Sequence, residues 1–482
     1  MRSGVLLLLV LAALGAAPAF AYAAARPLET GVTDPIEARE SGALELGLSR
    51  IHAAGARTVY MTLAWSTIAP VIRPPGFDAG NHLDPAYRWD YYDNRLRRYV
   101  ANGLRPILVI HYAPTWAEGA GDGPRGTNRP DPQELGLFAR AAATRYSGLS
   151  PTFPRVRLWQ VWSEPNLPSN LNPQYDHGRP FAATHYRRML ESAASALRSV
   201  RADNVVIAGG LAPFSNSSTV APLRFMRIVM CLSRTLQAIC PTRASFDVWS
   251  HHPYTTGGPT HQAFLADDAS LGDMPEVRRT LNAGIRYRRI ASTRPVRLWV
   301  TEFSWDTKPP DPHGVPMRVH TYWVAEALYR MWKAGVSLVV WHQLRDNPTV
   351  GENLLQSGLY FRGSNWANDR PKPSLRAFRF PVVAFPRVRG LYVWGRTPAG
   401  RPGRVVVERR GSGSWRRLGV VRTNAVGIFS VTFRGAPKTG VVRARAVSPR
   451  DLSAAFPLKR IRDFYVQPFG CWRFPCTGPG PG

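Results

Sequence analysis

Leu158–Asn166, which reads LWQVWSEPN, carries an apolar run to a single glutamate, and Leu298–Phe303, which reads LWVTEF, repeats the pattern. The aromatic and β-branched residues before each glutamate are typical of a buried strand. A carboxylate at the end of such a strand is costly to bury, and its pKa shifts readily in a cleft. Glu164 and Glu302 are therefore candidates for acid, base or nucleophilic catalysis.

Short β-rich runs alternate with helical stretches over most of the chain, which is the pattern of a parallel sheet with crossover helices. The predicted strands span residues 28–33, 58–65, 106–111, 156–164, 205–209, 246–254, 297–302 and 337–341. Helices are predicted near residues 41–54, 90–102, 132–146, 181–201, 219–234, 274–291, 316–334 and 373–380. Eight such βα units predict an α/β fold, a (β/α)8 TIM barrel formed by residues 26–385.

The two glutamates occupy equivalent places in this barrel. Glu164 closes the fourth predicted strand and Glu302 the seventh, so both face the mouth where such barrels carry catalytic residues. Side chains alternate along a strand, so Glu302 is expected to share a face with Val300 and Leu298. The same alternation places five further side chains at or near the mouth: Trp65, His111, His252, Tyr254 and Trp341.

The C-terminal part of the chain has a different texture. In residues 386–450, short alternating runs broken by Gly and Pro predict a small antiparallel β-sandwich domain. Its strands are predicted at 391–394, 404–408, 415–421, 427–433 and 441–446. Residues 451–482 form a tail for which the sequence predicts no regular structure.

The four cysteines form two close pairs, Cys231 with Cys240 and Cys471 with Cys476. This spacing suits two local disulfides in an oxidising compartment. A metal site is less favoured, because neither pair has C-x-x-C spacing or a suitably placed histidine. Free, buried thiols at Cys231 and Cys240 remain an alternative. No metal or organic cofactor is implied.

The N-terminus predicts export. Residues 1–23 contain a basic start, an apolar run and small residues, the pattern of a secretory signal peptide cut after Ala21 or Ala23. The apolar run is shorter than the ~20 residues of a spanning helix, and no later run reaches that length. A secreted protein, extracellular or associated with the cell wall and without a transmembrane segment after cleavage, is expected.

The chain is strongly basic, with 62 Lys+Arg against 32 Asp+Glu and a formal net charge of +30. Such a surface could hold an acidic polymer. The arginines are scattered through every segment, however, and no zinc-finger, RNA-recognition or basic-zipper pattern accompanies them. A background bias in arginine usage on a solvated surface is the favoured interpretation, and no specific nucleic-acid partner is predicted.

Four segments resemble motifs of clan A glycoside hydrolases. Trp162–Asn166 (WSEPN) resembles their W-N-E-P-N acid/base segment, and Thr301–Phe303 (TEF) their nucleophile segment. His252–Tyr254 (HPY) is similar to a segment on their sixth strand. Ser357–Tyr360 (SGLY) with the later Lys372-Pro373 resembles a late G-L-Y…K-P stretch. The likeness covers roughly residues 28–380 and is strongest to family 39-like and family 5-like members.

The resemblance implies a role for each matched residue. Glu164 would be the general acid/base and Glu302 the nucleophile of a retaining mechanism, with carboxyl groups about 5–5.5 Å apart. Tyr254 would hydrogen-bond the nucleophile, and Trp341 would form an aromatic floor for the sugar. His252 and Asn166 would shape the site as substrate-binding residues. Strand alternation, and not the resemblance, adds Trp65 and His111 as predicted substrate contacts, with filling of the barrel mouth as the alternative for His111; Ser163 is a further predicted contact. The chain would then be a secreted retaining hydrolase that cleaves O-glycosidic bonds of a polysaccharide or glycoside.

Ser163 departs from the family pattern, which has an asparagine that contacts the sugar 2-hydroxyl. A serine is shorter and offers one hydroxyl in place of an amide, so this contact is lost, water-mediated or different in kind. The departure motivates an alternative hypothesis, a catalytically weak barrel that binds glycan. A second alternative is a basic cell-wall or surface adhesion protein that binds through its C-terminal β domain.

Overall fold

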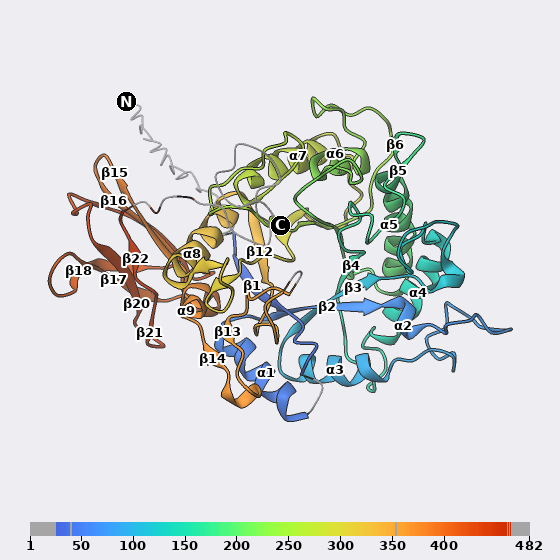
Figure 1. Cartoon of the computed structure of the whole chain (residues 1–482), viewed down its shortest axis with the longest axis horizontal. Coiled ribbons are helices and arrows are strands. Elements are labelled where there is room, and N and C mark those ends of the chain that lie inside the picture. The colour runs from blue at the N-terminus through green and yellow to red at the C-terminus, as the bar shows by residue number, and fades with distance from the viewer. Residues whose placement is uncertain (1–25, 39–40, 352–353, 460, 462, 464–482) are drawn as a thin grey trace, which may run out of the picture.

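A closed barrel of eight parallel strands forms the larger part of the molecule (Figure 1). The computed structural model describes residues 26–38, 41–351, 354–459, 461 and 463. Around the barrel the strands are β1 (Glu29–Thr33), β2 (Thr58–Ala64), β3 (Arg105–His111), β4 (Leu158–Val161), β7 (Val205–Leu211), β8 (Val248–His251), β9 (Arg297–Val300) and β12 (Val336–Trp341). Because β1 pairs with β12, the sheet has no open edge. The predicted (β/α)8 TIM barrel is confirmed.

Helices surround this barrel, and all of them except α2, whose first residue was predicted to end the second strand, agree with the sequence prediction in order and type. They are α1 (Ser41–Ala53), α2 (Trp65–Ile68), α3 (Asp90–Ala101), α4 (Pro132–Arg145), α5 (Phe181–Val200), α6 (Pro222–Val229), α7 (Met274–Arg286), α8 (Met317–Lys333) and α9 (Pro373–Arg379). Local capping explains some of the boundaries. The α4 helix begins after Asp131, whose carboxylate accepts hydrogen bonds from the backbone of Gln133 and Glu134.

Three predicted strands end two or more residues earlier than expected, and one of them is the strand predicted at 297–302, which ends at Val300. The strand predicted at 156–164 ends at Val161, and the one predicted at 246–254 ends at His251. Beyond β4 the backbone takes the left-handed conformation at Trp162, with φ of 66°, and again at Glu164, with φ of 44°. Left-handed residues cannot continue a strand, so Glu164 stands on an irregular turn beyond it.

Side chains alternate along β9, but the prediction that Glu302 shares a face with Leu298 and Val300 is wrong. Trp299 packs inside the barrel with Tyr60, Ile207 and other strand residues. Leu298 and Val300 instead belong to the larger core that the strands share with the helices. Glu302 therefore does not share its direction with these two residues, as simple alternation predicted. Glu302 lies two residues beyond the end of β9, where the alternation of side chains along a strand no longer applies.

The C-terminal part of the chain contains two antiparallel sheets, as predicted (Figure 1). Their strands extend from Val382 to Pro457, beyond the predicted bounds of 386–450 and into the predicted tail. One sheet has the order β15–β16–β19 and the other β18–β17–β20–β21, with β22 also paired to β20. The strands are β15 (Val382–Arg387), β16 (Gly390–Arg396), β17 (Arg404–Arg410), β18 (Arg416–Arg422), β19 (Ile428–Arg434), β20 (Val441–Ala446), β21 (Asp451–Leu452) and β22 (Phe456–Pro457). A side chain at Gly419 would meet the Phe433 ring at 2.9 Å, so the two sheets contact each other closely there.

The β domain packs against the barrel through aromatic residues and a buried arginine. The Trp394 ring of β16 lies 5.3 Å from both Tyr329 and Trp332 of α8. Arg396, which is 1% exposed, donates from Nη1 to the carbonyl of Leu28 at 2.7 Å, just before β1. The two parts of the chain therefore share one continuous apolar core.

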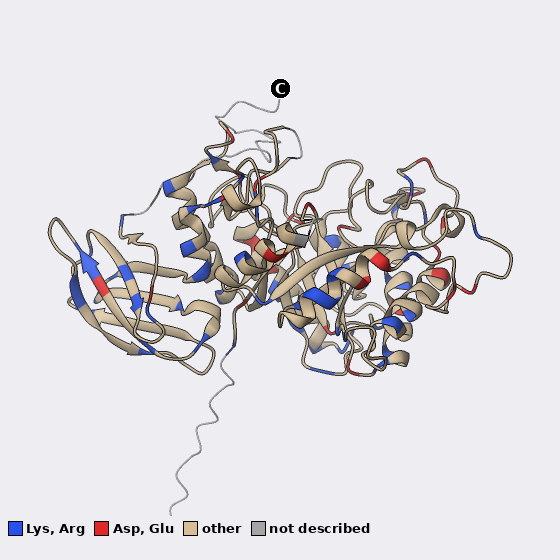
Figure 2. Ribbon diagram, turned by 90° about the horizontal axis from the view of Figure 1, so that it is seen from below, with Lys and Arg blue, Asp and Glu red and all other residues tan. Residues whose placement is uncertain are grey.

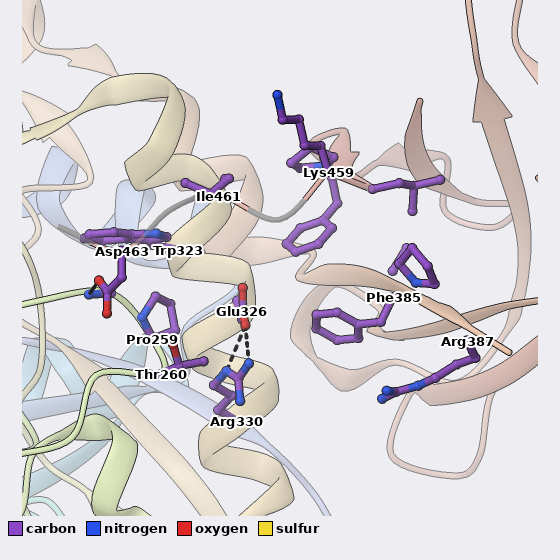
Figure 3. A pocket seen from close by; sticks show the side chains of 16 residues that line it. Pro259, Thr260, Trp323, Glu326, Arg330, Phe385, Arg387, Lys459, Ile461 and Asp463 are labelled. Atoms are coloured by element: carbon purple, nitrogen blue, oxygen red, sulfur yellow. Dashed lines mark hydrogen bonds and ion pairs between the residues drawn. The ribbon is translucent and has the colours of Figure 1, made fainter. Parts of the chain in front are cut away.

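A groove of about 250 Å³ lies between α8, the segment around Pro259 and the β domain (Figure 3). On its α8 side, Arg330 donates to Glu326 at 2.5 and 2.8 Å within one helical turn. On the β-domain side, Phe385 and Arg387 project from β15. Lys459, Ile461 and Asp463 follow the domain along the groove and bring the chain back towards the barrel.

The cysteines, the N-terminal segment and the charged residues were the subject of the other predictions. Cys231 and Cys240 form the predicted disulfide, with Cα atoms 5.7 Å apart. Cys471, Cys476 and the predicted signal peptide at 1–23 lie outside the described residues. None of the helices in the described part of the chain has the length and apolarity that a membrane crossing requires. Lys and Arg residues are spread along the backbone of both the barrel and the β domain, as the blue segments of Figure 2 show.

Candidate active site

Glu164 and Glu302 converge on one histidine at the C-terminal mouth of the barrel. His252, one residue after β8, is fully buried, and its Nδ1 lies 3.0 Å from Oε1 of Glu164. The same nitrogen lies 3.9 Å from Oε2 of Glu302. These two carboxylate oxygens are therefore at most about 7 Å apart, a limit that includes the ~5–5.5 Å carboxyl spacing of retaining glycosidases. The structure thus brings together the two glutamates that the sequence placed on separate strands.

The electrostatic setting of His252 comes from both carboxylates. Burial alone lowers the pKa of an imidazole, because the charged form loses hydration. Here the hydrogen bond to Glu164 and the charges of Glu302 and Glu164 outweigh burial, and the pKa of His252 is raised. On the other side of the ring, Nε2 lies 3.1 Å from the Thr301 hydroxyl, which fixes the ring orientation. His252 therefore acts as a shared positive or hydrogen-bonding centre between the glutamates.

Glu302 is held in the ionised form by three neighbours. The Tyr254 hydroxyl donates to Oε1 at 2.6 Å, and Nδ1 of His342 lies 3.9 Å from the same oxygen. Burial raises the pKa of Glu302, but the charges of His342 and His252 and the Tyr254 hydrogen bond lower it below its ordinary value. The Tyr254 hydroxyl keeps its proton, because burial and the Glu302 charge raise its pKa. An ionised, hydrogen-bonded carboxylate is what a nucleophile requires.

Ser163 does not have its hydroxyl free. Its Oγ lies 3.3 Å from the Tyr60 hydroxyl, which also accepts a hydrogen bond from Nε2 of Gln160 at 2.9 Å. Gln160 and Tyr60 both point into the barrel and are buried. Ser163, Tyr60 and Gln160 thus form a series of hydrogen-bonded side chains that runs from the mouth of the barrel into its interior.

Asn166, which was predicted to contact substrate, does not face the cleft. Its side chain is fully buried, with Nδ2 donating to the carbonyl of Ala212 at 3.0 Å and Oδ1 accepting from the amide of Ala212 at 2.9 Å. Both ends of the amide are therefore used to join the turn after β4 to the end of β7. Asn166 positions the turn that carries Glu164.

The two predicted tryptophan contacts also need correction. Trp65 is fully buried in α2, and its ring stacks on Phe138 of α4 at a centroid distance of 5.4 Å. Trp341 is 1% exposed and donates from Nε1 to the carbonyl of Ser357 at 2.8 Å. Trp65 lies in a helix beyond β2, and strand alternation turns Trp341 towards His320 of α8 and Phe378 of α9, so neither ring forms a floor or wall of the cleft.

His342 stands where Trp341 was expected. It is one residue further along the chain, so it projects in the opposite direction and approaches Glu302 while remaining 28% exposed. Tyr60 was also missed, although it lies on the predicted second strand with the inward alternation that could have identified it. His111 is 4% exposed, with its ring 4.8 Å from that of Trp162, and burial lowers its pKa to about 3.

A buried lysine joins the loops that follow β9 and β12. Lys372, from the predicted K-P segment, is fully buried and donates to Asp346 at 2.6 Å and to Thr307 at 2.7 Å. Nearby Asp306 is 4% exposed, and burial together with the charge of Asp311 raises its pKa to about 8. These contacts hold the segments that carry Glu302 and His342 in fixed relation.

The described residues contain no cluster of three or more His, Cys, Asp or Glu side chains arranged to hold a metal ion. No family model matches the sequence, and no curated protein matches it.

Solved structures of glycoside hydrolases share this architecture. A family 39 glycoside hydrolase from Bacteroides cellulosilyticus WH2 is 15% identical over 84% of this chain and 81% of its own, with a TM-score of 0.50. The fold is similar to that of family 39 glycoside hydrolases. A monomeric β-xylosidase from Caulobacter crescentus CB15 is 15% identical over 85% of this chain and 94% of its own, with a TM-score of 0.48. The family 39-like resemblance predicted from the motifs is thus confirmed at the level of the fold.

Proposed function

We propose that this protein is a retaining glycoside hydrolase with Glu302 as nucleophile and Glu164 as general acid/base. The observation that carries the proposal is the placement of both carboxylates around His252, with Glu302 ionised and hydrogen-bonded by Tyr254. The upper limit of about 7 Å between these oxygens supports retention, because it includes the spacing of about 5–5.5 Å in retaining enzymes and excludes most of the range of about 6.5–9.5 Å in inverting enzymes.

The proposed reaction has two displacements. First, a Glu302 oxygen attacks the anomeric carbon, the bond to the leaving oxygen breaks, and Glu164 gives that oxygen its proton. A water then attacks the anomeric carbon of the glycosyl-enzyme, Glu164 takes the water's proton, and Glu302 leaves as a carboxylate. The charge on each glutamate changes at each step. His252 contacts Glu164 and lies 3.9 Å from Glu302, so its ring is close to both changing charges.

The substrate is proposed to be an O-glycoside or polysaccharide met outside the cell. The disulfide between Cys231 and Cys240 supports an oxidising compartment, and the predicted signal peptide supports secretion. The net charge of +30 supports retention of the protein on an acidic polymer near its substrate.

A screen of aryl glycosides tests the proposal. Wild type is expected to release the aglycone from at least one sugar, whereas Glu302→Gln loses turnover yet still binds that sugar. A 2-fluoro glycoside should label Glu302 covalently, and peptide mass analysis identifies the labelled residue. A Glu191→Gln variant, which changes a glutamate on the surface-facing part of α5, is the control and should retain full activity.

Ser163 supports one further candidate function, a barrel that binds glycan with little turnover. Its hydroxyl is already engaged with Tyr60 at 3.3 Å, which weakens any contact with a sugar 2-hydroxyl. Sugar binding by wild type without release of any aryl group would favour this candidate. Loss of polymer binding on removal of the β domain, with no activity in the full chain, would instead favour an adhesion protein.

A further inference from the structure

A second cavity lies at the opposite end of the barrel from the glutamates. It has a volume of about 350 Å³, and its lining includes Arg26, Glu29, Arg278, Arg297, Trp299 and Ser337. Glu29, Arg297 and Ser337 stand at or next to the first residues of β1, β9 and β12. Because these strands are parallel, the cavity opens at the N-terminal face of the barrel, and we name it the basal cavity.

Three guanidinium groups line the basal cavity against a single carboxylate, and at Arg297 the charges of Glu29 and Asp247 offset only part of the effect of burial on its pKa. Within the described part of the chain, Arg26, Arg278 and Arg297 have no carboxylate within 4 Å. The one acid in the lining, Glu29, is already paired with Arg105 outside the cavity. The lining therefore carries a net excess of positive charge in a partly enclosed space.

Helix capping accounts for part of this cluster. Arg278 donates to the carbonyls of Ala334 at 3.2 Å and Gly335 at 2.6 Å, just after the C-terminal end of α8, and Arg26 donates to the carbonyl of Trp332. Basic residues at a helix C-terminus are favourable. Capping does not explain Arg297, whose guanidinium lies over the Trp299 ring at 5.2 Å.

The cluster has an electrostatic cost that an anion would relieve. Burial lowers the pKa of Arg26, and burial together with the charge of Arg26 lowers the pKa of Arg278 to about 10. A guanidinium has five N–H donors, so the hydrogen bonds to the α8 carbonyls leave donors of Arg278 unused. Arginine pairs well with the oxygens of phosphate and sulfate, through two parallel hydrogen bonds.

We propose that the basal cavity binds a divalent oxyanion, a phosphate or sulfate group. The group is either a free inorganic anion or an ester on a larger sugar, and the cavity volume leaves room beside a single tetrahedral group. This site is independent of the proposed glycosidase activity, because it lies at the other end of the barrel.

Thermal unfolding of the full chain in the presence of inorganic phosphate or sulfate tests the proposal. Ionic strength is held constant with chloride, so that general screening is the same in every sample. A ligand that binds the folded state raises Tm in a saturable manner. Glucose 6-phosphate and glucose 6-sulfate, with glucose as the neutral control, distinguish an ester ligand from the free anion.

Arg297→Gln and Arg297→Glu are the informative variants, because Arg297 is exposed and caps no helix. We expect Arg297→Gln to weaken anion binding about tenfold, the effect of one charge-assisted contact, and Arg297→Glu to abolish it. Arg404→Gln, at an exposed position on β17, is the matched control and should bind as wild type does. Hydrolase activity should be unchanged in all three variants.

A saturable rise in Tm with either the inorganic anion or the ester supports the site. The ligand that gives the rise shows whether the cavity takes a free anion or an esterified group. A Tm that does not respond beyond the chloride control overturns the proposal. So does an equal response in Arg297→Glu and Arg404→Gln, which would assign the effect to the general basic surface.

Discussion

The Tyr254 hydroxyl donates a 2.6 Å hydrogen bond to Oε1 of Glu302. This bond stabilises the ionised carboxylate, so Tyr254→Phe should raise the pKa of Glu302. Because the nucleophile must be ionised, the acidic limb of kcat/KM should move to higher pH, and its maximum should fall about 10–100-fold. The pH profile with an aryl glycoside measures both effects. Tyr287→Phe, far from the site, is the control, and an unshifted limb in Tyr254→Phe would contradict this role.

His342 contributes charge to the same carboxylate. Its Nδ1 lies 3.9 Å from Oε1 of Glu302, and its charge helps to lower the pKa of that group. His342→Gln keeps a polar side chain but removes the charge, so the acidic limb should again move to higher pH. His342→Lys should restore the limb at least in part. If both variants retained the wild-type profile while losing activity, His342 would act through packing only.

Ser163→Asn tests the departure from the family pattern. An asparagine amide can reach a sugar 2-hydroxyl, and contacts to this group strengthen in the transition state by several kcal/mol. We expect an increase in kcat of roughly tenfold or more on glycosides that carry a 2-hydroxyl, and no gain on 2-deoxy glycosides. Equal gains on both substrates would show that the change acts elsewhere. Tyr60→Phe is the companion variant, because it removes the hydrogen-bond partner of the Ser163 hydroxyl and leaves residue 163 unchanged.

The order of strands and helices could be predicted because local pattern and burial agree along the barrel. The end of β4 could not be predicted, because Trp162 and Glu164 adopt left-handed backbone conformations that their residue types do not indicate. The glutamates were still found, since a carboxylate after a buried strand is conspicuous at whichever residue the strand ends.

The partners of the glutamates were harder to predict than the glutamates themselves. Alternation beyond a strand end is unreliable, and a one-residue error exchanged Trp341 for His342 at the cleft. Asn166 looked like a substrate ligand, but its amide is satisfied by Ala212, a contact 46 residues away that no local pattern contains. Long-range pairing thus decides which polar groups remain available to a ligand.

Asp306 predicts a pH-dependent stability. Its pKa of about 8 in the folded protein lies above that of an unfolded aspartate, about 3.9, so folding favours the protonated form. This contribution is fully present below about pH 4 and is lost as the pH rises towards 8. Asp306→Asn should therefore gain about 1–3 kcal/mol relative to wild type between pH 5 and pH 8. Urea unfolding at the two pH values measures the difference, and a constant offset would contradict the assignment.

Trp394 tests the contact between the barrel and the β domain. Its ring is fully buried between Tyr329 and Trp332 of α8, so Trp394→Ala should lower the free energy of unfolding by about 3–5 kcal/mol. Trp415→Ala, on the outer part of the domain, should cost much less. Denaturant unfolding followed by tryptophan fluorescence and circular dichroism makes the comparison. If Trp394→Ala left barrel unfolding unchanged, the two parts would be energetically independent.

The hydrogen bond from Arg396 to the carbonyl of Leu28 joins residues 368 positions apart. During synthesis the first strand leaves the ribosome long before its β12 neighbour or Arg396 exists. The barrel therefore cannot close until β12 has been made, and the contact to Leu28 must wait longer still, until Arg396 is present. Strands at the start of the chain thus remain unpaired on one side for most of synthesis, and the wide sequence separation of these contacts makes closure a late step of folding.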